Sequence, residues 1–247
     1  MQNNTIKEFY AELFGTMIIL IFGNGVCAMN ALFNLGGYTN ITFGWGIAVF
    51  LGIIISNKIS GAHLNPAITI ALSLSKRFSW KKAPVYITAQ MLGGFIGSLI
   101  VYIFFRAKFL IIDPTLVNTA SIFTTFPAIN DFYSGFFAEV IATALLMFCI
   151  LNIVENFNTD KATFLTPFAV SALIIAIGMS LGAMHGYAMN PARDFSPRVL
   201  ISLLGFKNNG LTNGSFIWVT PVIGPIIGAI IGTFIYDITL KTNKPNN

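Results

Sequence analysis

The sequence predicts an all-α membrane protein in which six transmembrane helices and two re-entrant half-helices form an inverted three-helix repeat. Three features predict this fold: a shortage of charged residues, the lengths of the apolar segments, and a likeness between the two halves of the chain. Of the 247 residues, 55% are hydrophobic and only 9% are charged, whereas soluble proteins carry about 25% charged residues. So few charges cannot cover a surface that faces water, and we therefore expect the chain to be solvated by a lipid bilayer.

The net positive charge of the chain does not indicate a nucleic-acid partner. The formal charge is +5, but the basic residues lie mostly between apolar segments, where they set membrane topology, and no basic patch is interleaved with aromatic residues. Cys27 and Cys149 both lie within apolar segments, which favours packed free thiols over a disulfide or a metal site. We expect no metal and no cofactor. The first apolar segment lacks a cleavage pattern, so we expect it to be a retained span.

Six apolar segments are long enough to cross a bilayer, for which a helix needs roughly 20 residues. They lie at residues 9–32, 41–59, 84–105, 132–154, 167–181 and 216–240. Two further apolar segments, at 58–76 and 182–204, are interrupted by Asn-Pro and are too short or too broken to cross. We expect these two segments to enter the membrane and return on the same side.

Lysine and arginine predict the orientation of the chain. The basic residues at the ends of the spans are Lys7 near the start, Lys76, Arg77, Lys81 and Lys82 after the first broken segment, and Lys241 and Lys244 in the tail. The positive-inside rule makes these segments cytoplasmic, and six spans then place both termini in the cytoplasm. We expect one domain over residues 1–247, with repeat one at about 7–105, an extracellular connecting loop at about 106–131 and repeat two at about 132–240.

The two halves of the chain share a sequence pattern. Glu12 lies in Ala-Glu-Leu-Phe-Gly-Thr and Glu139 lies in the similar Ala-Glu-Val-Ile-Ala-Thr, and an Asn-Pro-Ala triplet follows at nearly the same spacing in each half. Each half contains three spans. Because three is odd, the second half must enter the membrane from the opposite side, as in inverted repeats whose broken helices meet near the midplane.

The two triplets are suited to start helices inside the membrane, because Asn is a favoured helix N-cap and Pro suits the first helical position. They are Asn65-Pro66-Ala67 and Asn190-Pro191-Ala192. Non-helical backbone at that depth is tolerated where it is buried or lines a wet cavity. We therefore expect the residues before each triplet to present backbone carbonyls to a permeating molecule. These residues are Gly61, Ala62, His63 and Leu64 in the first half and Gly186, Tyr187 and Ala188 in the second.

Inversion would bring the N-termini of both half-helices together. Each N-terminus carries about half a positive charge, so their meeting point repels cations and hydrated protons. Each Asn side-chain amide can donate a hydrogen bond to a neutral hydroxyl. A neutral, hydrogen-bonding solute is therefore the expected cargo.

At this point the sequence resembles a known family. Residues 60–67, Ser-Gly-Ala-His-Leu-Asn-Pro-Ala, and residues 186–194, Gly-Tyr-Ala-Met-Asn-Pro-Ala-Arg-Asp, are similar to the signatures of the major intrinsic proteins, and of their glycerol-facilitator branch in particular. The resemblance implies an aquaporin-like fold, a homotetramer with one pore per subunit, and a bacterial inner (plasma) membrane location. It also implies a passive channel for glycerol and other small uncharged solutes, which conducts water and has urea as a further candidate permeant.

The resemblance also implies a selectivity filter formed by Trp45, Gly178, Tyr187 and Arg193. In this family, the arginine donates hydrogen bonds to permeant hydroxyls, and the tryptophan and the second aromatic residue face the carbon backbone. Water-selective members usually carry Phe and His at the first two positions, so Gly178 is expected to leave room for a polyol. Asp194, Arg198 and Pro221 also resemble the glycerol-conducting branch. Tyr187 departs from the usual Phe, and its hydroxyl is expected either to narrow the filter or to add an acceptor.

Two carboxylates and two histidines leave alternatives open. Glu12 and Glu139 are proton carriers if the chain is an ion-coupled transporter, but their symmetric placement favours carboxylates that accept backbone N–H groups of the broken segments. His63 is a candidate for a pH-dependent gate, but the resemblance instead implies a residue whose backbone carbonyl lines the pore and whose ring is held in place. His185 is expected to be a solvated loop histidine, with a pH effect on flux as the alternative.

Three other functions remain to be compared with a glycerol channel. A water-selective channel is disfavoured by Trp45 and Gly178. An ion-coupled transporter would need titratable groups along the pathway, and only Glu12 and Glu139 are candidates. An enzyme is disfavoured because no metal-ligand cluster, nucleophile constellation or phosphate-binding loop is present in the sequence, and we expect no catalysed reaction.

Overall fold

A computed structural model describes residues 2–157 and 163–242, and these residues form eight α-helices and three short 3₁₀ helices. The α-helices are α1 (Gln2–Phe33), α2 (Tyr38–Ser60), α3 (Pro66–Leu74), α4 (Ala83–Ile112), α5 (Phe132–Asn156), α6 (Thr166–Leu181), α7 (Pro191–Leu203) and α8 (Thr220–Thr239). The 3₁₀ helices are η1 (Ala120–Ile122), η2 (Thr163–Leu165) and η3 (Ile217–Val219). In the described part of the chain, six helices are long and apolar enough to cross a membrane, which confirms the predicted set of spans.

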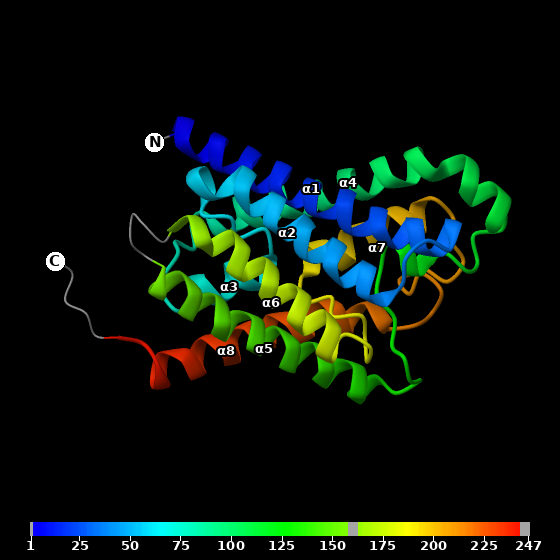
Figure 1. Ribbon diagram of the computed structural model, residues 1–247. Helices are drawn as coiled ribbons and strands as arrows, with labels where there is room; N and C mark the ends of the chain where they lie inside the picture. Colours follow the sequence, from blue (N-terminus) through cyan, green and yellow to red (C-terminus); the bar gives the residue numbers. More distant parts are fainter. Residues whose placement is uncertain (1, 158–162, 243–247) are drawn as a thin grey trace.

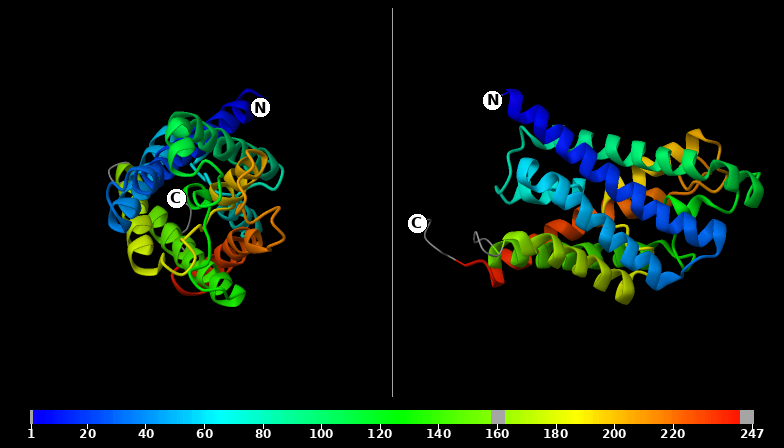
Figure 2. Two further views of the ribbon diagram at one scale, coloured as in Figure 1. Left: turned by 90° about the vertical axis from the view of Figure 1, so that its right-hand side faces the viewer. Right: turned by 45° about the horizontal axis from the view of Figure 1, so that its top comes forward.

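The helices form two groups that enclose the two short helices. Figure 1 shows α1, α2 and α4 on one side, α5, α6 and α8 on the other, and α3 and α7 between them. The end-on view in Figure 2 shows the long helices arranged as a ring around the centre of the molecule. Both ends of the chain lie at one end of the bundle, and we call the opposite end, where α4 ends and α5 begins, the distal end.

The two groups pack in the same way, through glycines. A Cβ atom added at Gly93 of α4 would lie 2.3 Å from the carbonyl oxygen of Leu13 in α1, and one at Gly228 of α8 would lie 2.3 Å from that of Val140 in α5. Helices can approach this closely only where a residue has no side chain. The equivalent contacts α1–α4 and α5–α8 confirm the inverted repeat.

Helix ends follow the local chemistry of the sequence. Asp131 caps α5 by accepting the backbone N–H of Ser134 at 2.8 Å, and Pro lies in the first two positions of α4, α6 and α8, where its missing N–H costs no helical hydrogen bond. At the end of α2, Gly61 adopts a left-handed backbone with φ 84°, a conformation that glycine adopts without steric cost.

The third span is longer than the sequence predicted. Its predicted end at residue 105 was wrong, because α4 continues to Ile112, and the connecting segment therefore begins at 113 and not at 106. The prediction ended the span where Arg106 and Lys108 interrupt the apolar run. A helix needs only continued backbone hydrogen bonds, however, and long basic side chains can lie along its surface. The Lys108 ammonium lies 5.0 Å from the centre of the Phe33 ring on α1.

Asp113 organises the start of this connecting segment. Its carboxylate accepts the backbone N–H groups of Val117, Asn118 and Thr119 at 3.1, 2.7 and 3.0 Å. Burial raises the pKa of Asp113, but these hydrogen bonds lower it by more, so the pKa lies below its ordinary value. The ionised carboxylate thus fixes the loop that leads to Thr125, a residue of the functional site.

Candidate functional site

A cavity of about 740 Å³ runs between the two groups of helices. Its walls include residues of both broken segments and of α1, α2, α5 and α6. Of the predicted site residues, those that line it are Trp45, Gly61, Ala62, His63, Leu64, Asn65, Tyr187, Ala188, Asn190 and Arg193. Gly178 and Gly186 are not among the lining residues.

The non-helical residues that precede α3 and α7 have matching backbone conformations. We call residues 61–64 the first lead-in and residues 186–189 the second lead-in. In each, φ is positive at the first, second and fourth residue, with values of 84°, 53° and 52° in the first lead-in and 79°, 38° and 51° in the second. Positive φ at non-glycine residues costs of the order of 1–3 kcal/mol each, so other contacts must hold both lead-ins in place.

The two asparagines cap their helices and bind each other's lead-in. Asn65 Oδ1 accepts the N–H of Ala67 at 2.9 Å, and its Nδ2 donates to the carbonyl of Met189 at 2.8 Å. Asn190 caps α7 in the same way and donates from Nδ2 to the carbonyl of Leu64 at 2.8 Å. Pro66 and Pro191 are the first residues of α3 and α7. The N-termini of the two half-helices therefore meet at this crossed pair of hydrogen bonds.

The crossed bonds change what each group can offer to a solute. An amide NH₂ has two hydrogens, so each asparagine keeps one for a further acceptor. The carbonyl of Leu64, which we expected to face the cavity as an acceptor, already accepts from Asn190. The sequence could not reveal this bond, because it joins residues that are 126 positions apart.

Glu12 holds the first lead-in. Its Oε1 accepts the N–H of His63 at 2.9 Å and the hydroxyl of Ser60 at 2.6 Å, and its Oε2 accepts the N–H of Leu64 at 2.7 Å and Nε2 of Gln90 at 2.7 Å. The side chain is fully buried. Four hydrogen bonds to the ionised form favour a fixed carboxylate.

Glu139 holds the second lead-in with the same backbone pattern. Its two oxygens accept the N–H groups of Ala188 and Met189, each at 2.8 Å. The side chain beside this carboxylate differs from those at Glu12. Nδ1 of His185 lies 3.7 Å from Glu139 Oε1, whereas Ser60 and Gln90 donate to Glu12.

His185 is buried, so the expectation of a solvated loop histidine was wrong. Only 2% of its surface is exposed. Its Nδ1 lies 3.4 Å from the Thr125 hydroxyl as well as near Glu139, and its ring fills the space beside Gly135, where an added Cβ would lie 2.7 Å from Cδ2. Gly135, which has no side chain, thus makes room on α5 for the His185 ring, which we had expected to be solvated.

His63 is held on the opposite side of the crossed asparagines. Its ring contacts Phe78 and Tyr86, with ring centres 4.5 and 5.0 Å away, and its Nδ1 lies 3.1 Å from the hydroxyl of Thr69. The ring is therefore fixed by packing and one hydrogen bond, and the residue lines the cavity.

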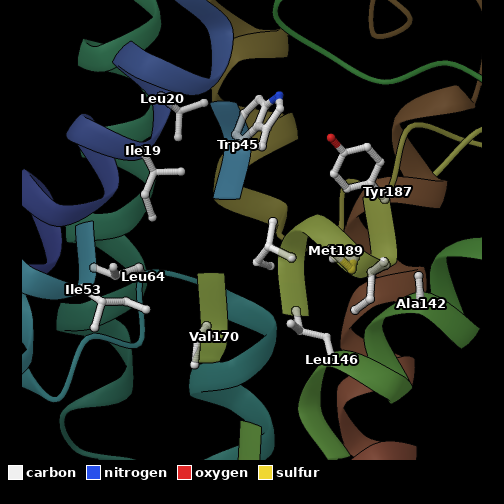
Figure 3. Packing of buried hydrophobic residues seen from close by; sticks show 12 residues of the cluster. Ile19, Leu20, Trp45, Ile53, Leu64, Ala142, Leu146, Val170, Tyr187 and Met189 are labelled. Atoms are coloured by element: carbon white, nitrogen blue, oxygen red, sulfur yellow. The ribbon is translucent and has the colours of Figure 1, made fainter. Parts of the chain in front are cut away.

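The four residues of the expected filter lie together. The Arg193 guanidinium lies 4.2 Å from the centre of the Trp45 ring, and its Nη1 donates to the carbonyl of Phe123 at 3.3 Å. Figure 3 shows the Tyr187 hydroxyl pointing toward Trp45. Tyr187 also lies over Gly178, since a Cβ added there would be 2.9 Å from Tyr187 Cζ. We expected the space above Gly178 to be left open. It is not, because the tyrosine ring fills part of it.

A buried ion pair supports the start of α7. Asp194 and Arg198 are fully buried, and Arg198 Nη2 lies 2.8 Å from Asp194 Oδ1. Asp194 also accepts the N–H and the hydroxyl of Thr125 at 2.7 and 2.8 Å, and Arg198 donates to the carbonyls of Thr125 and Asn209 at 2.7 and 2.9 Å. The ion pair thereby joins α7 to the segments before α5 and α8. Pro221, which also resembles the glycerol-conducting branch, is buried in the first turn of α8.

The comparisons with known proteins show the family of the chain. The sequence model of the major intrinsic protein family matches residues 1–236. The chain belongs to the major intrinsic protein family. It is 41% identical over 240 residues to the glycerol uptake facilitator protein of Bacillus subtilis, covering 96% of this chain and 86% of that protein. It is 40% identical over 237 residues to aquaglyceroporin-3 of Trypanosoma brucei brucei, covering 93% and 77%.

A solved structure of the same family shows the same fold. The aquaglyceroporin from Plasmodium falciparum superposes with a TM-score of 0.84 at 32% sequence identity, over 96% of this chain and 97% of that one. Together with the six membrane-capable helices, family membership makes this chain an integral membrane protein.

Several residues of the site in this family member were missed by reasoning from sequence. They are Ser60 and Gln90 at Glu12, Phe123 at Arg193, and Thr125 and Asn209 at the buried ion pair. Gln90 gave a signal that could have been used, because it is a lone amide in the apolar span 84–105. The loop residues gave none, since Phe123 acts through its backbone carbonyl and small polar residues such as Thr125 and Asn209 are common in any connecting segment.

Proposed function

We propose that this chain is a passive channel for glycerol and similar small uncharged solutes, that it also conducts water, and that it excludes ions and protons. The observation that carries the proposal is the crossed pair of asparagines on the wall of the 740 Å³ cavity. One amide hydrogen of each asparagine remains for a solute hydroxyl. The names of the relatives, a glycerol uptake facilitator and aquaglyceroporins, support glycerol as the solute.

The cavity has two kinds of wall, which suits a polyol. Apolar side chains line much of it, namely those of Ile19, Val49, Ile53, Leu146, Val170 and Ile174. The lead-ins and the asparagines supply polar atoms along the other part. A polyol has carbon on one side and hydroxyls on the other, so such a pathway replaces its lost water on both sides. Water alone would not need the apolar wall.

Cations are disfavoured where the half-helices meet. The N-termini of α3 and α7 point at the same place, and each contributes about half a positive charge. Arg193 adds a full charge at the filter, where its exposed fraction is 8%. A neutral solute that accepts hydrogen bonds is favoured by the same groups.

We infer a location and an assembly from the same features. The lysine and arginine residues near the termini and after α3 place both termini in the cytoplasm by the positive-inside rule, and the distal end then faces outward. The bacterial relatives favour the inner (plasma) membrane. A homotetramer with one pore per subunit is proposed from family membership.

Stopped-flow light scattering on proteoliposomes tests the function, with separate water, glycerol and urea gradients and protein-free liposomes as the control. We expect glycerol uptake that is linear with concentration, non-saturating and insensitive to an uncoupler. Water flux without glycerol flux would support a water-selective channel instead. Saturable, uncoupler-sensitive uptake would support an ion-coupled transporter, and either result would contradict the proposal.

A further inference from the structure

Tyr38 lies beside the filter, although neither its sequence position nor the filter pattern points to it. It is the first residue of α2 at the distal end, and its hydroxyl donates to the carbonyl of Gly178 in α6 at 2.8 Å. The two residues are 140 positions apart. This hydrogen bond joins the start of α2, the helix that carries Trp45, to the helix that carries Gly178.

Tyr38 and Tyr187 pack on the same glycine. A Cβ atom added at Gly182 would lie 2.2 Å from the hydroxyl oxygen of Tyr38 and 2.3 Å from Cδ1 of Tyr187. The two tyrosines therefore share the surface that the absent side chain leaves open. Tyr38 occupies one side of this surface and the filter ring occupies the other.

Tyr187 is positioned by packing and not by a hydrogen bond of its own hydroxyl. The hydroxyl is buried and has no partner among the described residues. Its ring packs on Gly178, where an added Cβ would lie 2.9 Å from Tyr187 Cζ, and on Gly182, where an added Cβ would lie 2.3 Å from Tyr187 Cδ1. Any group that fixes these two glycines therefore fixes how far the ring projects toward Trp45.

We propose that Tyr38 is a positioning residue of the filter: its bond to Gly178 and its contact at Gly182 hold the Tyr187 ring and so set the width of the constriction. The consequence is an upper limit on the size of the solute that passes. This inference rests on the proposed channel function, but it concerns the relative permeability of solutes and not which solute is physiological.

The test measures the permeability of Tyr38→Ala and Tyr38→Phe in proteoliposomes for water, urea, glycerol and linear four- and five-carbon polyols. Tyr133→Ala is the matched control, because Tyr133 also lies at the distal end and is 70% exposed. We expect Tyr38→Ala to raise the ratio of five-carbon polyol permeability to glycerol permeability about threefold or more, which corresponds to a change of about 0.65 kcal/mol in the difference between the two permeation barriers. Tyr38→Phe, which loses only the hydroxyl, should give a smaller rise, and the control should give none.

Unchanged ratios in both Tyr38 variants would overturn the inference. If the wild type does not conduct glycerol, the proposed function fails separately. The Tyr38 claim is then judged on the ratio between the largest solute that the wild type conducts and water. A rise in that ratio would support it, and no change would contradict it.

Gly182→Ala supplies a second test that does not depend on truncating Tyr38. Its new methyl group would clash with both tyrosines and with the carbonyl oxygen of Gly178, 2.5 Å away, and should lower glycerol permeability more than water permeability. Tyr38→Ala in the same chain removes one of the three clashes and should restore part of the glycerol flux. Effects that simply multiply would contradict a shared surface, because independent sites show no coupling.

Discussion

The first half-helix region, residues 61–74, and the second, residues 186–203, have nearly the same backbone but different surroundings. Each begins with the same pattern of positive φ values, is held by one glutamate through two backbone N–H groups, and starts its helix at an asparagine that binds the opposite lead-in. The shared features are those that the inverted repeat duplicates.

The regions differ in charge. The helix α3 contains no charged residue, and Glu12 is satisfied by neutral donors such as Ser60 and Gln90. The helix α7 carries Arg193 and the buried pair of Asp194 and Arg198. It also depends on the loop residue Thr125, which binds that pair.

This difference indicates a division of roles. Both regions form the meeting point of the half-helices, which favours neutral solutes over cations. Of the two regions, only the second also contributes to the proposed filter, through Tyr187 and Arg193. Changes in the first region should therefore affect all solutes alike, whereas changes at the filter should affect glycerol and water differently.

The largest expected effect is on stability, and it belongs to the second region alone. Asp194→Asn leaves Arg198 buried without its counter-ion, which should lower the free energy of unfolding by about 3–5 kcal/mol. The control is Asp237→Asn, which breaks the partly exposed pair with Arg77 and should cost about 1 kcal/mol or less. Thermal unfolding in detergent measures both, and equal losses would contradict a special role for the buried pair.

The next effect compares the two glutamates. Glu12→Gln replaces one acceptor oxygen by an NH₂ group that faces donors, and should lower stability by about 2–4 kcal/mol. Glu139→Gln should lower it less, because its described hydrogen bonds come from two backbone N–H groups. Water and glycerol permeability should fall together in Glu12→Gln, whereas Glu139→Gln, which loosens the lead-in that contains Tyr187, should also change their ratio. A stable variant that loses only an uncoupler-sensitive flux would instead make the carboxylate a proton carrier.

A smaller effect is expected at His185. Its Nδ1 lies 3.7 Å from Glu139, the carboxylate that accepts the N–H groups of Ala188 and Met189. The other groups that face it are Thr125 and, through it, Asp194. Because the ring packs beside the carboxylate that holds the second lead-in, we expect His185→Ala to lower glycerol permeability up to about threefold.

His63→Ala, in the first region, is the comparison. It should lower glycerol and water permeability alike, whereas His185→Ala should change their ratio. A ratio in His185→Ala that matches the wild type would contradict a role for this histidine.

The sequence was sufficient where structure depends on local chemistry. The spans followed from runs of apolar residues, and the half-helices followed from Asn and Pro at positions that start helices. The paired glutamates were found because the repeat places them symmetrically. The positions of Trp45, Gly178, Tyr187 and Arg193 came from the family resemblance, and the structure places them together.

The rest depends on contacts between distant parts of the chain. The burial of His185 follows from Gly135, 50 residues earlier, and from Thr125 in the connecting segment. The filling of the space over Gly178 follows from the path of the second lead-in. No local pattern in the sequence encodes these contacts, so residue type alone suggested a solvated ring and an open space.

The most direct test of the division of roles is the ratio of glycerol to water permeability in Gly178→His. Its Cβ would lie 2.9 Å from Tyr187 Cζ, so the new side chain must push the ring toward Trp45 and narrow the filter. We predict that glycerol permeability falls about tenfold or more, equivalent to about 1.4 kcal/mol, while water permeability changes by less than about threefold. An equal loss of both permeabilities, or an unchanged ratio, would contradict the account.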